Sequence, residues 1–195
     1  QEVKRTWVGG MDPDKADQML KNAVKLANFT VYDQAQQFEE FTGMGTTLVA
    51  VLIHGKFATI VNVGDSRAYL VDDHGILQVT TDHSLVQMMI ARGELTPEKA
   101  KHYPGKNLIT RAVGTEAVVM CDLFHTEVAK GDYVLLCSDG LSNYTDPSVF
   151  TNILFSSSHW FISQDEDLAK RTDALISYAN EKGGSDNITV VLLAY

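Results

Sequence analysis

Three aspartates, far apart in the chain, each lie where a hydrophobic, strand-like run gives way to a turn of small residues. They are Asp65, Asp139 and Asp186. A carboxylate at the end of a buried strand is costly unless a cation meets it, and the neighbouring glycines leave room for a close approach. Oxygen ligands without a cluster of histidine or cysteine favour magnesium or manganese over zinc. The pattern predicts that folding gathers the three carboxylates around divalent metal ions.

Composition favours one acidic globular domain. The chain has 195 residues, of which 45% are hydrophobic and 21% charged, so residues 1–195 can share one sizeable core. No stretch resembles a linker or a second domain. The formal net charge of −9 argues against nucleic acid or an anionic membrane as a partner, because both need clustered lysine and arginine.

The cysteine content and the hydropathy of the chain predict a soluble, cytoplasmic protein. Only two cysteines occur, Cys121 and Cys137, and both lie in apolar runs, which favours small buried core residues over a disulfide framework. No run reaches the roughly 18 apolar residues of a membrane helix. Residues 1–10 also lack the apolar core of a signal peptide.

Helix and strand signals predict the elements that must position the aspartates. Asp12-Pro13-Asp14 is typical of a helix start, and apolar residues at helical spacing extend this helix to about Gln37. Residues 84–106 read as a helical insert, with helix starts at Ser84 and Thr96. Further helices are expected from Asp146-Pro147 and from Asp165-Glu166-Asp167. Strands are expected at 46–53, 57–63, 67–71, 108–113, 122–128, 133–137 and 187–194.

The grouping of these elements favours an α+β fold. Runs of strands joined by hairpins make antiparallel sheets, and the helices lie between the runs rather than alternating with single strands. A two-sheet β-sandwich flanked by helices is therefore expected, rather than a doubly wound parallel sheet.

A single Gly-Asp turn is weak evidence, because aspartate beside glycine is ordinary turn chemistry. The three aspartates, however, occur together with further motifs in a fixed order. These are Gly43-Met44-Gly45-Thr46-Thr47, Thr81-Asp82-His83-Ser84-Leu85-Val86 and Asn107-Leu108-Ile109-Thr110-Arg111-Ala112-Val113-Gly114.

With these motifs, the sequence resembles the metal-dependent serine/threonine protein phosphatases of the PPM (2C) family, bacterial branch, from about Leu20 to the C-terminus. The resemblance implies a four-layer α/β/β/α sandwich in which the insert 84–106 is the family's flap. It implies that Asp139 and Asp186 hold one of two catalytic Mn²⁺ or Mg²⁺ ions, and that Asp65 joins Asp139 at a third. Asn187 is expected to hydrogen-bond a metal ligand rather than the metal.

The implied activity is hydrolysis of phosphoserine and phosphothreonine in proteins by a metal-activated water, without a covalent enzyme intermediate. Phosphorylated proteins are the implied partners, together with a cognate serine/threonine kinase. The alternative is a catalytically silent domain of the same fold that binds a phosphoprotein or a regulatory partner.

The sequence departs from the family at its start. The family's opening strands, with a phosphate-binding arginine and an Asp-Gly-Met-Gly-Gly turn that bridges the metals, have no counterpart here. We therefore expect a fragment, or the ordered part, of an active phosphatase. Its metal affinity should be weak, and its uncovered sheet edges should favour strand exchange or self-association.

Other groups of reactive residues have simpler interpretations. Asp82-His83-Ser84 contains the residue types of a hydrolase triad, but sequence neighbours point in different directions, so a loop and helix cap is favoured. Met88 and Met89 are expected to pack rather than to bind a partner. Core packing is also the expectation for Trp160-Phe161.

Overall fold

A computed structural model describes residues 12–143, 147–155 and 164–195. The chain divides into two compact units. The first unit comprises residues up to 65 together with 81–126, and the second comprises 66–80 together with 127–195. Each unit is described by itself below, and a single domain over 1–195 stays a prediction.

The first unit contains a three-stranded sheet in the order β1 (Leu48–His54), β2 (Phe57–Val63) and β5 (Asp122–Glu127). Strands β1 and β2 form a tight antiparallel hairpin, with Leu48 opposite Val63 and His54 opposite Phe57. Gly55 has a φ of 56°, which glycine adopts readily at the first position of a two-residue hairpin turn. The predicted hairpin is therefore confirmed.

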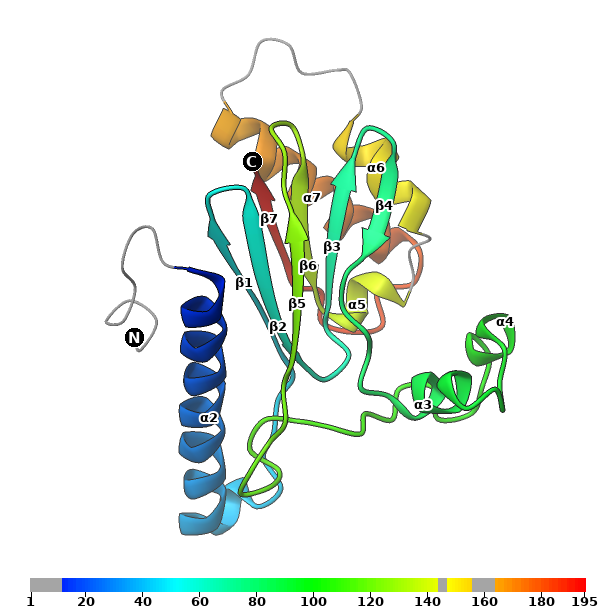
Figure 1. Cartoon of the computed structure of the whole chain (residues 1–195). Helices are drawn as coiled ribbons and strands as arrows, with labels where there is room; N and C mark the ends of the chain where they lie inside the picture. The colour runs from blue at the N-terminus through cyan, green and yellow to red at the C-terminus, as the bar shows by residue number, and fades with distance from the viewer. Residues whose placement is uncertain (1–11, 144–146, 156–163) are drawn as a thin grey trace. The chain divides into compact units, whose positions relative to one another are not determined.

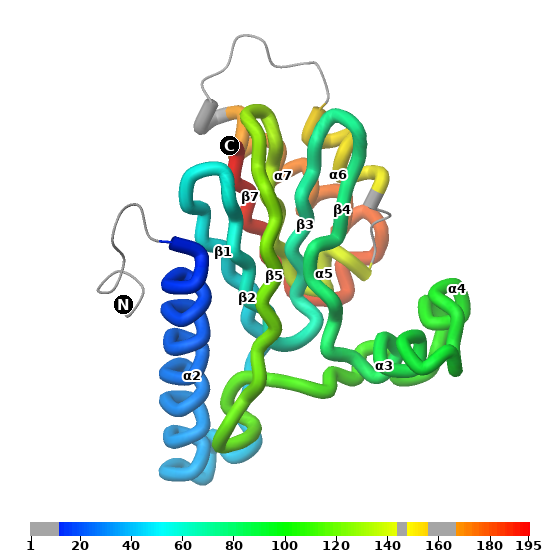
Figure 2. Tube along the Cα trace, in the orientation of Figure 1, coloured from blue at the N-terminus to red at the C-terminus, as the bar shows by residue number. Residues whose placement is uncertain are grey.

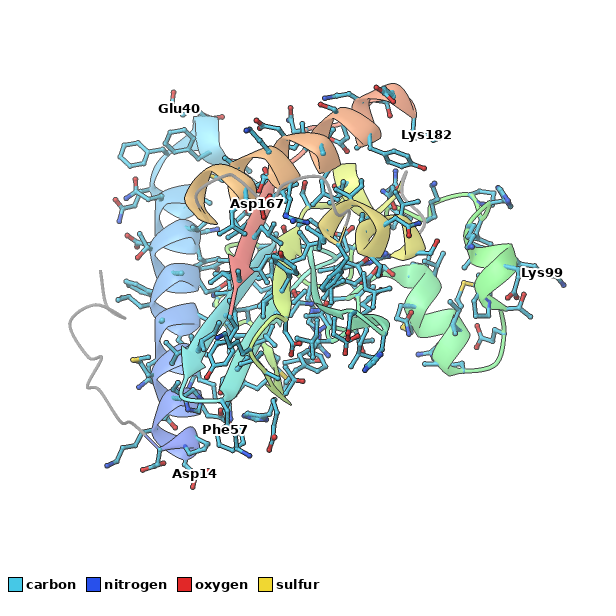
Figure 3. All side chains as sticks on the ribbon, turned by 90° about the horizontal axis from the view of Figure 1, so that it is seen from above. Asp14, Glu40, Phe57, Lys99, Asp167 and Lys182 are labelled. Carbon is cyan, nitrogen blue, oxygen red and sulfur yellow. The ribbon has the colours of Figure 1, made fainter. Side chains whose placement is uncertain are left out.

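Helix α2 (Pro13–Gln37) packs on this sheet, and Figures 1 and 2 show it running beside β1 and β2. The Asp12 carboxylate caps it by accepting a hydrogen bond from the Lys15 backbone N–H at 3.2 Å. In Figure 3, Asp14 lies at the N-terminal end of α2 and Glu40, in the short 3₁₀ helix η1 (Glu39–Phe41), lies past its other end. The buried side chains of this core are Leu20, Val24, Val61, Val63 and Val113.

The predicted insert of the first unit is helical. It contains α3 (Leu85–Ala91) and α4 (Pro97–Ala100), capped by Ser84 and Thr96 as expected. In Figure 1 both helices extend away from the strands of their own unit. Helix α3 has no fully buried residue and Met88 is 37% exposed, so that Met88 and Met89 pack rather than bind a partner stays a prediction.

The strand predicted at 108–113 was also wrong. This segment makes only two isolated bridges, Ser84 with Ile109 and Thr46 with Val113. Its backbone groups bond the two ends of the insert and the segment before β1 instead of a neighbouring strand. The bonds include Thr110 N–H to the His83 carbonyl at 2.8 Å and Val113 N–H to the Thr46 carbonyl at 2.8 Å. Leu108 and Ile109 are exposed and only Ala112 and Val113 of this segment are buried, so its apolar residues do not form a continuous buried strand.

The second unit contains a four-stranded sheet, β4 (Gly75–Gln78), β3 (Arg67–Asp72), β6 (Tyr133–Cys137) and β7 (Val190–Ala194), in which every neighbouring pair is antiparallel. Helix α5 (Asp139–Ser142) contacts β6, α6 (Pro147–Leu154) contacts β3 and β4, and α7 (Gln164–Glu181) contacts β7. In Figure 3, Asp167 and Lys182 lie towards opposite ends of α7. The buried core comprises Tyr69, Val71, Leu135, Cys137, Leu141, Phe150, Leu154, Leu175 and Ala179.

Several predicted boundaries in the second unit change. Strand β7 begins at Val190, not at Asn187, and its residues are half-buried or exposed. Helix α7 begins at Gln164, just before the predicted acidic start. Asp146 and the Trp160-Phe161 pair lie outside the described residues. None of the helices formed by the described residues has the length and apolar character needed to cross a membrane.

Candidate functional site

Asp139 lies at the corner where β6 ends and α5 begins, and Ser138 fixes this corner to the loop before β7. The Ser138 hydroxyl donates to the Asn187 carbonyl at 3.1 Å and accepts from the Thr189 N–H at 3.0 Å. The Ser138 N–H also donates to the Thr189 carbonyl at 3.1 Å. Three hydrogen bonds therefore hold the two segments that carry Asp139 and Asp186 against each other.

Gly140 makes this close approach possible. A β-carbon at position 140 would overlap the carbonyl oxygen of Asn187 and lie 2.9 Å from its carbonyl carbon. Any larger residue would push α5 away from the loop that contains Asp186. The glycine after Asp139 therefore has a packing reason, namely that the backbone of a second segment occupies the place of its side chain.

The electrostatics of this corner are those of two carboxylates brought close together. Burial raises the pKa of Asp139, the negative charge of Asp186 raises it further, and nearby backbone N–H groups and Arg67 only partly offset the rise. Polar contacts hold both carboxylates: Asn143 Nδ2 donates to Asp139 Oδ2 at 3.3 Å, and the Asn187 N–H donates to Asp186 Oδ1 at 2.7 Å. A cation between the two carboxylates would relieve their repulsion.

The described contacts of Asn187 come from its backbone. Its N–H donates to Asp186 and its carbonyl accepts from Ser138. It therefore orients a predicted ligand through the main chain, and a hydrogen-bonding role for its side-chain amide stays a prediction.

Asp65 belongs to the first unit, where it follows Gly64 at the end of β2. Gly64 has a φ of 106°, and a β-carbon there would overlap the side chain of Thr47, so both conformation and space require glycine. The structure brings Asp139 and Asp186 near each other within the second unit. That Asp65 joins them stays a prediction.

The turn at Gly64 is held by His83, which is only 6% exposed. The Gly64 N–H donates to His83 Nδ1 at 3.0 Å, and the His83 N–H donates to the Gly64 carbonyl at 2.9 Å. The other ring nitrogen, Nε2, lies 3.1 Å from Asp122 Oδ2. The partner of His83 is therefore Asp122 and not Asp82, and Ser84 is a helix cap, so the rejection of a sequence-local triad is confirmed.

Asp122 also accepts from Arg111, with 2.7 Å between Arg111 Nη1 and Asp122 Oδ1. Desolvation acts to raise the pKa of Asp122, but hydrogen bonds from His83 and Arg111, together with the positive charge of Arg111, outweigh it and lower that pKa. Sequence reasoning missed this cluster. The available signal was an arginine inside one predicted strand, 108–113, and an aspartate at the start of another, 122–128.

The first unit also contains a pocket of about 370 Å³ beside Arg111, with mostly apolar walls. It is lined by Ile109, Thr110, Arg111, Ala112, Thr115, Glu116, Val118, Val119 and Met120. Two of these side chains, Val118 and Met120, are more than 70% exposed, so the pocket lies open to solvent.

The donor set fits a hard divalent cation. Over residues 12–143, 147–155 and 164–195, no group of three or more histidine, cysteine, aspartate or glutamate side chains could hold a metal ion on its own. Magnesium, however, is commonly held by one or two carboxylates, with water and substrate phosphate completing its octahedron. The pair Asp139 and Asp186 meets this requirement.

Comparison with known proteins identifies the family. Residues 4–182 match the family described as protein phosphatase 2C. The chain is 37% identical, over 92% of its length and 68% of the relative's, to the serine/threonine phosphatase stp of Listeria monocytogenes. The chain belongs to the protein phosphatase 2C family of serine/threonine phosphatases.

Solved structures agree with this family. The serine/threonine phosphatase Stp1 from Staphylococcus aureus superposes with a TM-score of 0.88 at 35% identity, covering 100% of this chain and 74% of Stp1. The catalytic domain of PstP in complex with two manganese ions superposes with a TM-score of 0.79 at 34% identity, covering 97% of this chain and 74% of PstP. The predicted α+β class with two antiparallel sheets and flanking helices is confirmed, and the family's dependence on a divalent metal is supported.

Proposed function

We propose that this protein hydrolyses phosphoserine and phosphothreonine in phosphorylated proteins, and that Asp139 and Asp186 are ligands of a catalytic divalent cation. The observation that carries the proposal is that Asp139 and Asp186 lie close enough to repel each other. The hydrogen bonds of Ser138 and the close packing at Gly140 hold the two carboxylates in place despite this repulsion. A carboxylate whose pKa is raised by burial and by a neighbouring carboxylate is more typical of a functional site than of a structural one.

Each residue of the proposed site has a distinct role. Asp139 and Asp186 bind the cation, and the backbone of Asn187 orients Asp186. Asp65 would contribute to a third, more loosely held cation. When bound, divalent cations lower the pKa of water and offset the charge on the phosphoryl oxygens, which supports direct attack of water on phosphorus.

The cysteines support a mechanism without a thiol nucleophile. Cys137 is buried, and burial raises the pKa of the Cys121 thiol, with its backbone hydrogen bond and nearby lysines only partly opposing the rise. Since the thiolate is the nucleophilic form, neither residue is suited to accept a phosphoryl group.

We further propose that manganese is the preferred metal, in line with the two manganese ions in the PstP structure. Anomalous scattering from crystals grown with MnCl₂, measured at the manganese edge, tests the assignment of Asp139 and Asp186 as metal ligands. A peak beside both Asp139 and Asp186 is expected, and a peak that touches neither would refute the ligand assignment.

Turnover distinguishes an enzyme from a silent binding module. We expect hydrolysis of p-nitrophenyl phosphate and of a phosphothreonine peptide that requires Mn²⁺ and is lost in Asp139→Asn. Absence of turnover, with no rise of Tm on adding Mn²⁺, would instead favour the phosphoprotein-binding module.

The cellular setting we propose is the cytoplasm, opposite a serine/threonine kinase that supplies the phosphoproteins. Neither Cys121 nor Cys137 forms a disulfide, which supports a reducing compartment. Cell fractionation with an antibody to the protein would test the location.

A further inference from the structure

The proton of the buried His83 ring can be placed from its partners alone. A backbone N–H can only donate, so the 3.0 Å contact from Gly64 requires Nδ1 to be an unprotonated acceptor. The ring hydrogen of a neutral imidazole is then on Nε2, from which it donates to Asp122 Oδ2 at 3.1 Å.

Arg111 fixes the acceptor of this bond. Its Nη1 lies 2.7 Å from Asp122 Oδ1 and 3.1 Å from His83 Nε2. Because both nitrogens are donors in this tautomer, they do not bond each other and instead converge on the two oxygens of one carboxylate. Asp122 therefore holds the imidazole in one tautomer and one orientation, and Arg111 holds Asp122.

The opposite side of the ring controls the Gly64 turn. Both backbone polar groups of Gly64 are bonded to His83: its N–H to the ring, and its carbonyl to the His83 N–H at 2.9 Å. Asn62 Nδ2 adds a bond to the same carbonyl at 3.2 Å. Since the next residue is Asp65, the direction in which its carboxylate leaves the backbone depends on this peptide.

We propose that His83 is a positioning residue: its neutral ring, oriented by Asp122 and Arg111, holds the Gly64 peptide and thereby aims Asp65 at its cation. The link to a cation rests on the function proposed above. The hold on the turn stands on the geometry of the first unit alone.

Two substitutions separate the two sides of the ring. In His83→Asn the amide oxygen lies as many bonds from the backbone as Nδ1, so it can still accept from Gly64 but cannot reach Asp122. In His83→Gln the amide nitrogen takes the place of Nε2, so the bond to Asp122 survives while the acceptor for Gly64 is lost. Both substitutions replace the imidazole by a neutral side-chain amide, so each is the control for the other.

NMR of the ¹⁵N-labelled protein gives the direct readout. In the wild type we expect the proton of His83 on Nε2 and a scalar coupling across the bond from Gly64 N–H to Nδ1. Exchange of the Gly64 amide with solvent should accelerate about tenfold or more in His83→Gln, as for loss of one hydrogen bond. It should change far less in His83→Asn.

Metal binding gives the second readout. Free Mn²⁺ counted by electron paramagnetic resonance should show the weakest site loosened by about tenfold in His83→Gln, as in Asp65→Asn, and nearly retained in His83→Asn. A proton on Nδ1, or equal effects of Asn and Gln on Gly64 exchange, would overturn the proposal. If Gly64 responds as expected but the wild type binds no Mn²⁺, the proposed metal function fails and the hold of His83 on the turn stands.

Discussion

Asp122 in the first unit and Asp139 in the second begin from similar positions and have opposite electrostatics. Asp122 is the first residue of β5, and Asp139 follows the end of β6 with only Ser138 between them. Desolvation acts to raise the pKa of both aspartates. For Asp122, bonds from His83 and Arg111 outweigh that effect and lower the pKa. For Asp139, the main partner is another carboxylate, Asp186, and the pKa is raised.

The opposite pKa shifts indicate that Asp122 is a structural carboxylate and Asp139 a functional one. Asp122 has its counter-charge within the fold, so its ionised form contributes to stability. Asp139 is held by Ser138 and Gly140 in a place where its ionised form is disfavoured, a cost that folding alone does not explain. The cost becomes reasonable if the missing positive charge is a metal ion supplied from solution.

Removing the charge of Asp139 should have the largest effect of the substitutions that test this contrast between Asp122 and Asp139. Asp139→Asn should lower Mn²⁺-dependent kcat/KM by about 100-fold or more, because a ligand of the cation is lost. Its Tm in EDTA should not fall, because the repulsion from Asp186 is lost as well. The control is Asp173→Asn on the exposed side of α7, which should leave both quantities unchanged. A normal turnover in Asp139→Asn would remove the basis for the metal site.

Gly140 tests whether close packing keeps the two carboxylates together. Gly140→Ala would drive a methyl group into the Asn187 carbonyl, and we expect a loss of about 1–3 kcal/mol in the free energy of unfolding. Mn²⁺ affinity should fall as well, because the loop that carries Asp186 must move. Urea denaturation measures the first effect and calorimetry the second.

Gly75→Ala is the matched control, since nothing lies within 4 Å of a β-carbon there and its backbone is not left-handed. If Gly140→Ala were as stable as Gly75→Ala, the space that glycine leaves at this corner would not be needed.

The two aspartates should also give opposite dependences of stability on pH. The lowered pKa of folded Asp122 contributes stability above the ordinary value of about 4, and this contribution is lost as pH falls through the folded pKa. The raised pKa of folded Asp139 has the reverse sign: its contribution is present below about pH 4 and is lost as pH rises through the folded pKa.

Unfolding in EDTA between about pH 3 and pH 7 measures both dependences. The stability cost of Asp122→Asn should grow towards neutral pH, whereas Asp139→Asn should gain relative stability over the same range. Parallel pH dependences in the two variants would contradict the comparison.

Sequence signals predicted the parts of both units that are fixed by local chemistry. The cap at Asp12, the hairpin at Gly55 and the small-residue turns at Asp139 and Asp65 could be read because each depends on a few neighbouring residues. Segment 108–113 was predicted wrongly because its apolar, branched residues suit a strand, whereas its backbone bonds the two ends of the insert and the segment before β1.

The His83 cluster was beyond the reach of sequence patterns for a different reason. Its bonds join Gly64, His83, Arg111 and Asp122, which are separated along the chain and share no periodicity. The same holds for the carbonyl of Asn187 against Gly140, which depends on how two loops pack rather than on the type of either residue.

Asp65 provides the smallest and most discriminating effect. As a ligand of a loosely held cation, Asp65→Asn should reduce turnover by less than about tenfold, because one charged ligand among several is lost and shape is retained. The loss should be recovered at high Mn²⁺, whereas the loss in Asp139→Asn should not, since saturation can restore a weakened site but not a missing catalytic ligand. Titration of turnover against Mn²⁺ measures this, with the exposed Asp73→Asn as the charge-matched control. If Asp65→Asn were as inactive as Asp139→Asn at saturating Mn²⁺, Asp65 would belong to the catalytic cations themselves, and its assignment to a loosely held cation would be wrong.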